Sequence, residues 1–268
     1  SEILAGALQD YNRAVIVGES STFGKGTVQQ PMDIGRMLPL FAVRNRAGFL
    51  KVTIQKFYRP SGSSTQMDGV KSDVVIPSMM DALEVGEAFL DHSLPHDRSR
   101  HAADFRPLDQ QNLFIPRLKE LSQQRLKDSR DFNYVIEDVL KTKDRLKNNT
   151  VSLNKEVREK ELAESDQQQK ERNVERRSRF AKMAKEDKDE FKFFKLTLED
   201  LEKGADLRPY DPADESGEYM RRAKDEAEDL DETPKWPTGL DPVKRESMMV
   251  LRDLADLTES ARMAGVNK

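Results

Sequence analysis

A short apolar run, residues 14–17, lies between a helical pattern and a loop rich in glycine, serine and threonine. Residues 2–11 carry apolar side chains at helical spacing, which predicts the end of a buried helix with Ile3, Leu4, Ala7 and Leu8 on its inner face. An apolar run of this length directly after a helix is typical of a strand buried on both faces of an α/β sheet. The loop at residues 18–26 therefore lies at the carboxyl end of this strand, where ligands and chemistry gather in open α/β sheets.

Two further segments predict strands. Residues 49–58 alternate apolar and polar side chains over much of their length, which favours a half-buried strand. Residues 74–76 form another short apolar run, and Pro77 ends it. Together with the first strand, these segments predict a compact α/β unit over residues 1–80.

The second half of the chain has a different, helical pattern. Apolar residues recur at three- and four-residue spacing over residues 118–140, which predicts a helical hairpin joined near residues 128–131. The same spacing at residues 248–263 predicts a final helix. Residues 152–190 are so polar that they indicate either a long solvated helix or a partly disordered segment. Residues 211–232 are strongly acidic, with prolines around them, and predict a flexible linker.

The predicted fold class is therefore an α/β (α+β) core followed by a mostly α-helical carboxy-terminal domain. We divide the chain into a core domain at residues 1–80, a connecting loop at 81–110 and a helical domain at 111–268, with an acidic linker near 211–240. The chain is 36% hydrophobic and 35% charged, with a mean hydropathy of −0.78. Such a polar chain cannot fill one large core, which agrees with long solvated helices.

The composition excludes several classes of function. The net charge is −4 with both signs abundant, so the basic field that nucleic acid requires is missing. The absence of cysteine excludes disulfides, thiolate metal ligands and a thiol nucleophile. No apolar run approaches the roughly 18 residues of a membrane-spanning helix. The chain opens in a helical pattern without a methionine, so we expect it to be a fragment of a longer protein.

The loop at residues 18–26 carries a lysine between two glycines, which first suggests a phosphate-binding P-loop. That motif needs four residues between its glycines and a serine or threonine after the lysine. Here five residues separate Gly18 from Gly24, and Gly26 follows Lys25. The pattern fails at two required positions, so phosphate binding is disfavoured.

Lys25 has two remaining interpretations. An ordinary lysine is protonated at neutral pH, because the side-chain pKa lies near 10.4, and burial among apolar groups can favour the neutral amine that a base requires. Phe23, Val28 and the flanking glycines offer a largely uncharged setting, with no acidic residue between Glu19 and Asp33. Chemistry alone nevertheless favours the commonest fate of a lysine, an exposed loop position.

Motifs along most of the chain resemble the carboxy-terminal processing, or tail-specific, protease family. The most specific is Phe-Gly-Lys-Gly-Thr-Val-Gln at residues 23–29. Residues 151–161 resemble the helical extension of the large tail-specific proteases of Gram-negative bacteria. The other matching segments are residues 1–10, 13–19, 55–58, 62–66 and 69–77.

The resemblance implies a serine endopeptidase that uses a serine–lysine mechanism. In that family the nucleophile opens a Ser-Ala-Ser-Glu segment, of which Ser1-Glu2 matches only the second half, so we expect the nucleophilic serine two residues before Ser1. Lys25 corresponds to the general base and Gln29 to the residue that assists it. Ser1 itself is interpreted as a helix-capping or packing serine. The chain departs from the family by an inserted residue and a lost proline between Glu19 and Phe23, and by Ser72 in place of proline.

The resemblance also implies partners and a setting. Substrates would be unfolded or tail-exposed proteins, a PDZ-like domain would precede this chain, and the location would be periplasmic; a lipoprotein adaptor is a further partner that it allows. It implies no cofactor and no metal. The alternative is a non-catalytic scaffold or partner-binding module that presents a charged helical arm.

Four other residues are weaker candidates. Asp10, at the predicted helix end, would pair with Arg13 or assist the site, and the structural role is favoured. His92, His96 and His101 are close enough in sequence to suggest a metal site. No carboxylate pattern completes that site, so solvated loop histidines are favoured.

Overall fold

The computed structural model describes residues 1–268 except 38–45, 193, 205, 210–233, 235–240 and 266–268. The chain divides into two compact units, Ser1–Asn148 with Glu246–Lys268, and Asn149–Arg245. Apart from Pro234, the acidic linker predicted at residues 211–240 lies outside the described residues. The assignment of domains at residues 1–80, 81–110 and 111–268 stays a prediction.

The first unit begins with α1 (Glu2–Asp10), followed by β1 (Val17–Gly18), which pairs in parallel with β4 (Val74–Val75). The strand predicted at residues 74–76 is present as β4, but of the run predicted at residues 14–17 only Val17 lies in a strand, because β1 spans Val17–Gly18. The parallel pairing of β1 with β4 gives the α/β character expected of this region. Val17 is half-buried, so the strand is not covered on both faces as predicted. Val74 lies in a core cluster with Leu118 and Val250, which joins the strand pair to the helices.

The predicted buried face of α1 is wrong. Ile3 and Leu4 are 62% and 65% exposed, and Gly6 is the buried residue of the helix. A Cβ at Gly6 would lie 3.3 Å from Nε of Arg59, so the helix packs against that side chain instead of burying its apolar stripe. Helical spacing identified the helix correctly but did not identify the face that is covered.

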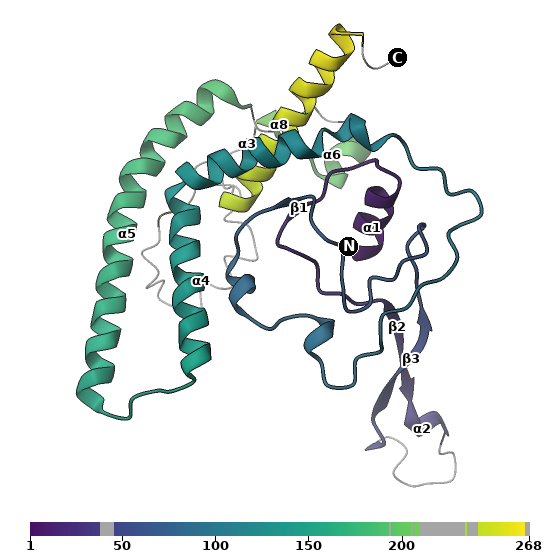
Figure 1. The fold of residues 1–268 in the computed structure, drawn as a ribbon, viewed down its shortest axis with the longest axis horizontal. Helices are drawn as coiled ribbons and strands as arrows, with labels where there is room; N and C mark the ends of the chain where they lie inside the picture. The colour runs from purple at the N-terminus through teal and green to yellow at the C-terminus, as the bar shows by residue number, and fades with distance from the viewer. Residues whose placement is uncertain (38–45, 193, 205, 210–233, 235–240, 266–268) are drawn as a thin grey trace. The chain divides into compact units, whose positions relative to one another are not determined.

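The longest strands form an antiparallel ribbon of β2 (Thr27–Asp33) and β3 (Phe49–Lys56) (Figure 1). The short α2 (Ile34–Met37) follows β2 at the far end of the ribbon. The strand predicted over residues 49–58 is present, but its half-buried character is wrong, because Phe49 is 74% exposed and most of β3 is exposed as well. Within the described part of the chain, β3 pairs with β2 and not with the strand pair β1–β4.

A helical hairpin and a final helix complete this unit. α3 (Ile115–Asp128) and α4 (Arg130–Asn148) confirm the hairpin and its joint, and α8 (Pro242–Met263) confirms the final helix. Leu126 and Phe132 pack with Ile76 in a second core cluster. The intervening single turns of 3-10 helix are η2 (Met79–Ala82), η3 (Glu87–Phe89) and η4 (Gln110–Leu113).

The second unit contains the long helix α5 (Lys155–Glu190). Of the two predictions for residues 152–190, a long solvated helix or a partly disordered segment, the helix is therefore confirmed. Asn154 caps its start, where the side-chain oxygen accepts a 2.9 Å hydrogen bond from the backbone N–H of Glu156. β5 (Phe194–Lys195), α6 (Leu198–Lys203) and β6 (Arg208–Pro209) follow. Across the described ranges, no helix is long and apolar enough to cross a membrane.

Candidate active site

The lysine loop, residues 22–26, leads directly into β2 and brings Lys25 to Gln29. The Nζ of Lys25 donates a 3.0 Å hydrogen bond to Oε1 of Gln29. The ladder is irregular at this point, because Val28 pairs with Gln55 while Gln29 pairs with Thr53, so Ile54 bulges from β3. Such a bulge re-aims side chains locally, and it lies directly across from Gln29. The structure thus places the two predicted site residues in contact.

Glu2 holds the other side of the lysine loop, and sequence reasoning missed this role. One carboxylate oxygen accepts a 2.8 Å hydrogen bond from the N–H of Gly24 and another from the hydroxyl of Thr22. The second oxygen accepts from the N–H of Lys25 at 3.1 Å. Glu2 lies in the first turn of α1, so the lysine backbone is fixed to the start of that helix. An acidic residue at a helix start was a signal, but its partners are 20 to 23 positions away in sequence.

The two glycines around Lys25 are required by close packing. Gly24 has a φ of +91°, and a Cβ there would lie 2.8 Å from the backbone oxygen of Met67. A Cβ at Gly26 would lie 2.7 Å from the backbone nitrogen of Gln66. Both approaches are closer than side-chain carbons make, so the Gly-Lys-Gly sequence allows residues 66–67 to pack directly beneath the loop.

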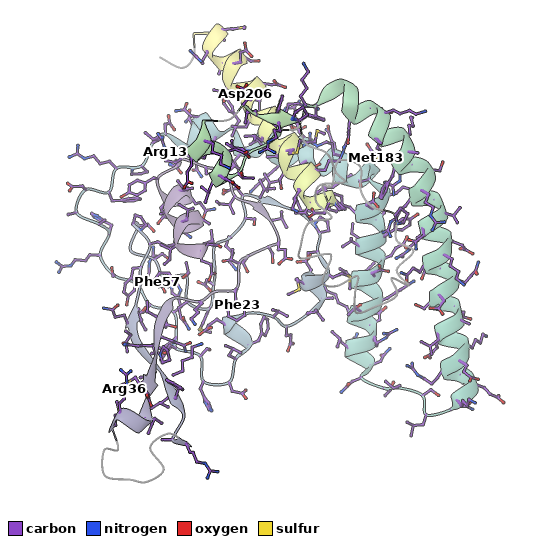
Figure 2. All side chains as sticks on the ribbon, turned by 180° about the vertical axis from the view of Figure 1, so that it is seen from behind. Arg13, Phe23, Arg36, Phe57, Met183 and Asp206 are labelled. Atoms are coloured by element: carbon purple, nitrogen blue, oxygen red, sulfur yellow. The ribbon has the colours of Figure 1, made fainter. Side chains whose placement is uncertain are left out.

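The backbone of the lysine loop also makes three hydrogen bonds to that neighbouring segment. The hydroxyl of Thr65 donates to the carbonyl of Lys25 at 3.0 Å, and the N–H of Met67 donates to the carbonyl of Gly24 at 2.8 Å. The Oε1 of Gln66 accepts from the N–H of Gly26 at 2.9 Å. Thr65 and Gln66 are fully buried. The Lys25 amine therefore extends from a backbone that has little freedom to move, while Phe23, labelled in Figure 2, leaves the same loop half-exposed.

The carboxyl end of α1 is anchored by a largely buried ion pair. Asp10 pairs with Arg59 and not with Arg13, and it also accepts a 3.0 Å hydrogen bond from the N–H of Ser61. Burial would raise the pKa of the Asp10 carboxyl, but the hydrogen bonds from Arg59 and Ser61 outweigh that cost and hold the pKa below its ordinary value. Asp10 thus has the structural role favoured from the sequence, since Arg59 begins the turn that leads to residues 64–67.

Ser1 occupies the N-cap position of α1, but its side chain makes no capping hydrogen bond. Ser1 therefore has the expected position of a capping residue but does not cap the helix through its side chain. Its neighbour Glu2, and not Ser1, connects the helix start to the lysine loop.

The three histidines have separate surroundings. Nδ1 of His96 lies 3.2 Å from the carbonyl of Gln66 and 3.3 Å from a carboxylate oxygen of Asp68. Nδ1 of His101 lies 2.9 Å from the carbonyl of Ala102. Among the residues that the structure describes, no group of three or more histidine or carboxylate side chains is placed to hold a metal ion.

Two protein families match the sequence. Residues 80–256 match the family described as the C-terminal domain of tail specific protease (DUF3340), and residues 1–76 match Peptidase family S41. The first match covers more than half of the chain. This chain belongs to the tail-specific protease family. The resemblance found in the sequence motifs is thereby confirmed.

Curated relatives of this tail-specific protease chain each match part of it. The tail-specific protease of Haemophilus influenzae is 47% identical over 98 residues, which is 37% of this chain and 14% of that protein. The carboxy-terminal-processing protease of Bartonella bacilliformis is 43% identical over 76 residues, or 28% of this chain and 15% of that protein. The carboxyl-terminal-processing protease of Picosynechococcus is 43% identical over 77 residues, or 29% and 16%. The chain therefore spans only a small part of the length of these relatives.

Proposed function

We propose that this chain supplies the general base of a serine endopeptidase that cleaves proteins at or near their carboxyl termini. The observation that carries the proposal is the 3.0 Å hydrogen bond from Lys25 Nζ to Gln29 Oε1, on a backbone held by Glu2, Thr65 and Gln66. An amine held in one position by a neutral acceptor can take a proton from a nearby hydroxyl once it is deprotonated.

The nucleophile in this proposal is a serine two positions before Ser1 in the full-length protein. Lys25 removes the hydroxyl proton as the serine oxygen attacks the scissile carbonyl, and the protonated amine then gives that proton to the leaving amine. The acyl-enzyme is hydrolysed when Lys25 takes a proton from water, and protonation of the serine oxygen restores the enzyme. Gln29 accepts a hydrogen bond from the amine throughout and so orients it.

The contacts of Glu2 support the placement of that serine. Glu2 binds the N–H groups of Gly24 and Lys25 from the first turn of α1, so the start of this helix and the lysine loop are adjacent. A residue just ahead of the helix therefore lies on the side of the molecule where Lys25 emerges. This arrangement supplies the proximity that a nucleophile–base pair requires.

Three further features belong to the proposal through family membership. The substrates are proteins with unfolded or exposed tails, a PDZ-like domain in the full-length protein captures the tail, and the enzyme acts in the periplasm. A lipoprotein adaptor that delivers substrate is compatible with the exposed helical surfaces of the chain.

The test is cleavage of a tail-tagged protein by the full-length protease carrying Lys25→Ala. We expect turnover to fall to background while the thermal unfolding midpoint stays unchanged, because the Lys25 side chain makes one exposed hydrogen bond. Lys51→Ala, an exposed lysine of β3, is the matched control and should cleave normally. Unchanged cleavage by Lys25→Ala would refute the base assignment.

A further inference from the structure

Gln66 is buried beneath the lysine loop, where its side chain bonds to three other residues. Its side chain is fully buried, and each of its hydrogen-bonding groups is used. Oε1 accepts from the N–H of Gly26 at 2.9 Å, while Nε2 donates to Oε1 of Glu87 at 3.0 Å and to the carbonyl of Leu94 at 2.9 Å. The N–H of Gly26 and the carbonyl of Leu94 dictate this orientation of the amide, because one can only donate and the other can only accept.

The partners of Gln66 come from two different parts of the chain. Gly26 belongs to the region that matches the peptidase family, and Glu87 and Leu94 belong to the region that matches the C-terminal domain family. The amide of Gln66 therefore bridges the lysine loop to residues that the sequence suggested were only a connecting loop. We call residues 86–102 the connector.

The connector runs along the peptidase region and touches it repeatedly. At its start the N–H of Glu87 donates to the carbonyl of Phe23 at 2.8 Å, within the lysine loop itself. Further along, a carboxylate oxygen of Asp97 accepts from Nζ of Lys56 at 2.9 Å and from the hydroxyl of Tyr58 at 3.2 Å. Near its end the N–H of Ser99 donates to the carbonyl of Gly62 at 2.8 Å.

We infer that Gln66 is a positioning residue for Lys25, and that the connector, through Glu87 and Leu94, buttresses the lysine loop from behind. This inference rests on the proposed function, because it assigns a role relative to the base. Gly26 is one peptide unit from Lys25, so a displacement of its N–H moves the amine. Misplacement by about 1 Å is enough to reduce turnover by about a hundredfold. The connector then supports the active site and does more than join two domains.

Gln66→Glu is the informative variant, because it keeps shape and replaces the donor with an acceptor. Its carboxylate faces the carboxylate of Glu87 and the carbonyl of Leu94, while His96 and Asp68 lie near the backbone of the same residue. Gln66 Nε2 and Glu87 Oε1 are 3.0 Å apart, so the new carboxylate at position 66 would lie next to that of Glu87. Two carboxylates this close cannot both ionise without cost, so we expect them to share a proton as pH falls.

The experiment measures kcat and KM against pH for the full-length protease. For Gln66→Glu we expect kcat at neutral pH to fall by about a hundredfold with KM little changed, and to recover towards the parent value at lower pH. Adding Glu87→Gln should restore neutral-pH kcat to within about tenfold of the parent, because an amide at position 87 donates to the new carboxylate. The exposed Glu84→Gln is the matched control and should leave kcat and its pH profile unchanged.

The outcomes separate the inference from the proposed function. An inactive Lys25→Ala together with a fully active Gln66→Glu overturns the inference alone, whereas an active Lys25→Ala overturns the base role and the inference with it. A third outcome also overturns the inference: kcat of Gln66→Glu falls, Glu87→Gln does not restore it, and the pH profile stays parallel to that of the parent. Gln66 would then have only a structural role. If Gln66→Glu does not fold, Glu87→Ala decides: a fall in kcat at unchanged KM supports the buttress, and unchanged kcat refutes it.

Discussion

The lysine loop and helix α5 are stabilised in opposite ways. The loop has almost no regular structure, and its backbone is held by Glu2, Thr65 and Gln66, which lie 23 to 40 positions away in sequence. α5 is 36 residues of continuous helix, and the exposed ion pairs along it join residues three or four positions apart, such as Lys155 with Glu159 and Arg158 with Glu161.

The difference shows where precision is needed in this protein. Ion pairs between residues one turn apart favour a helix, but the helix tolerates the loss of any one pair, because each exposed pair contributes little to stability. Buried bonds between distant segments give a single arrangement, and the loss of one partner leaves the other unsatisfied in the interior. Four predictions test this contrast, in order of decreasing effect on the free energy of unfolding.

The largest effect is expected at the junction of α3 and α8. Arg125 contacts Glu246 at 2.9 Å and Asp253 at 2.7 Å, and the side chain of Glu246 is 6% exposed. Burial alone would lower the pKa of the guanidinium, but these two carboxylates raise it. Arg125→Met should reduce the free energy of unfolding by about 3–5 kcal/mol, because two carboxylates lose their cation.

Chemical denaturation measures this change. Arg117→Met, which removes an exposed pair with Glu120 on the same helix, is the control and should cost no more than about 1 kcal/mol. Equal costs for the two variants would contradict the contrast. A double variant, Arg125→Met with Glu246→Leu, should recover part of the loss, because an apolar pair can replace the buried ion pair with Glu246 while Asp253 still lacks its cation.

The second prediction concerns Asp10, whose pKa is lowered in the folded protein. A lowered pKa means that the carboxylate stabilises the fold above its unfolded pKa, and that this contribution disappears as pH falls below about 4. Asp10→Asn should lower the free energy of unfolding at neutral pH by about 2 kcal/mol and flatten its dependence on acid. Unfolding curves between neutral pH and pH 3 test this, and the exposed Asp104→Asn is the control. If Asp10→Asn leaves the acid dependence of stability unchanged, the result is inconsistent with the ion pair to Arg59.

The third prediction concerns Glu2. Glu2→Gln loses the charge that attracts the N–H groups of Gly24 and Lys25, which should cost about 1–2 kcal/mol of stability. Cleavage by the full-length protease should fall by about a hundredfold, because the lysine backbone is no longer fixed to the helix start. Asp91→Asn, an exposed acidic residue, is the control, and normal cleavage by Glu2→Gln would show that the loop is held sufficiently by residues 65–67.

The smallest effect is expected on α5. Lys182 and Glu186 are 3.7 Å apart, with side chains 80% and 57% exposed. Lys182→Ala should change the free energy of unfolding by less than about 0.5 kcal/mol, and helix content by circular dichroism should stay the same. A loss comparable to that of Glu2→Gln would mean that α5 is not stabilised locally.

Much of the secondary structure could be predicted from the sequence. The helical hairpin, the final helix and the short strands follow from spacing of apolar residues, because a helix or strand repeats its faces at a set period. The pairing of Lys25 with Gln29 also follows from sequence, since the two residues are four positions apart and the motif around them is specific.

Burial could not be predicted in the same way. The apolar face of α1 and the apolar residues of β3 are exposed, although their patterns indicated covered surfaces. Periodicity shows which residues share a face, but only the neighbours in space decide whether that face is covered.

The sequence by itself determined which residues we propose for the chemistry, Lys25 and Gln29, because the motif and the spacing are local properties. Only the tertiary structure decided what holds them: Glu2 from the start of α1, Gln66 from beneath the loop, and Glu87 from the connector. Those residues are polar, ordinary in their local context and far apart along the chain. Their function arises from hydrogen bonds that form only when the folded backbone brings buried donors and acceptors together.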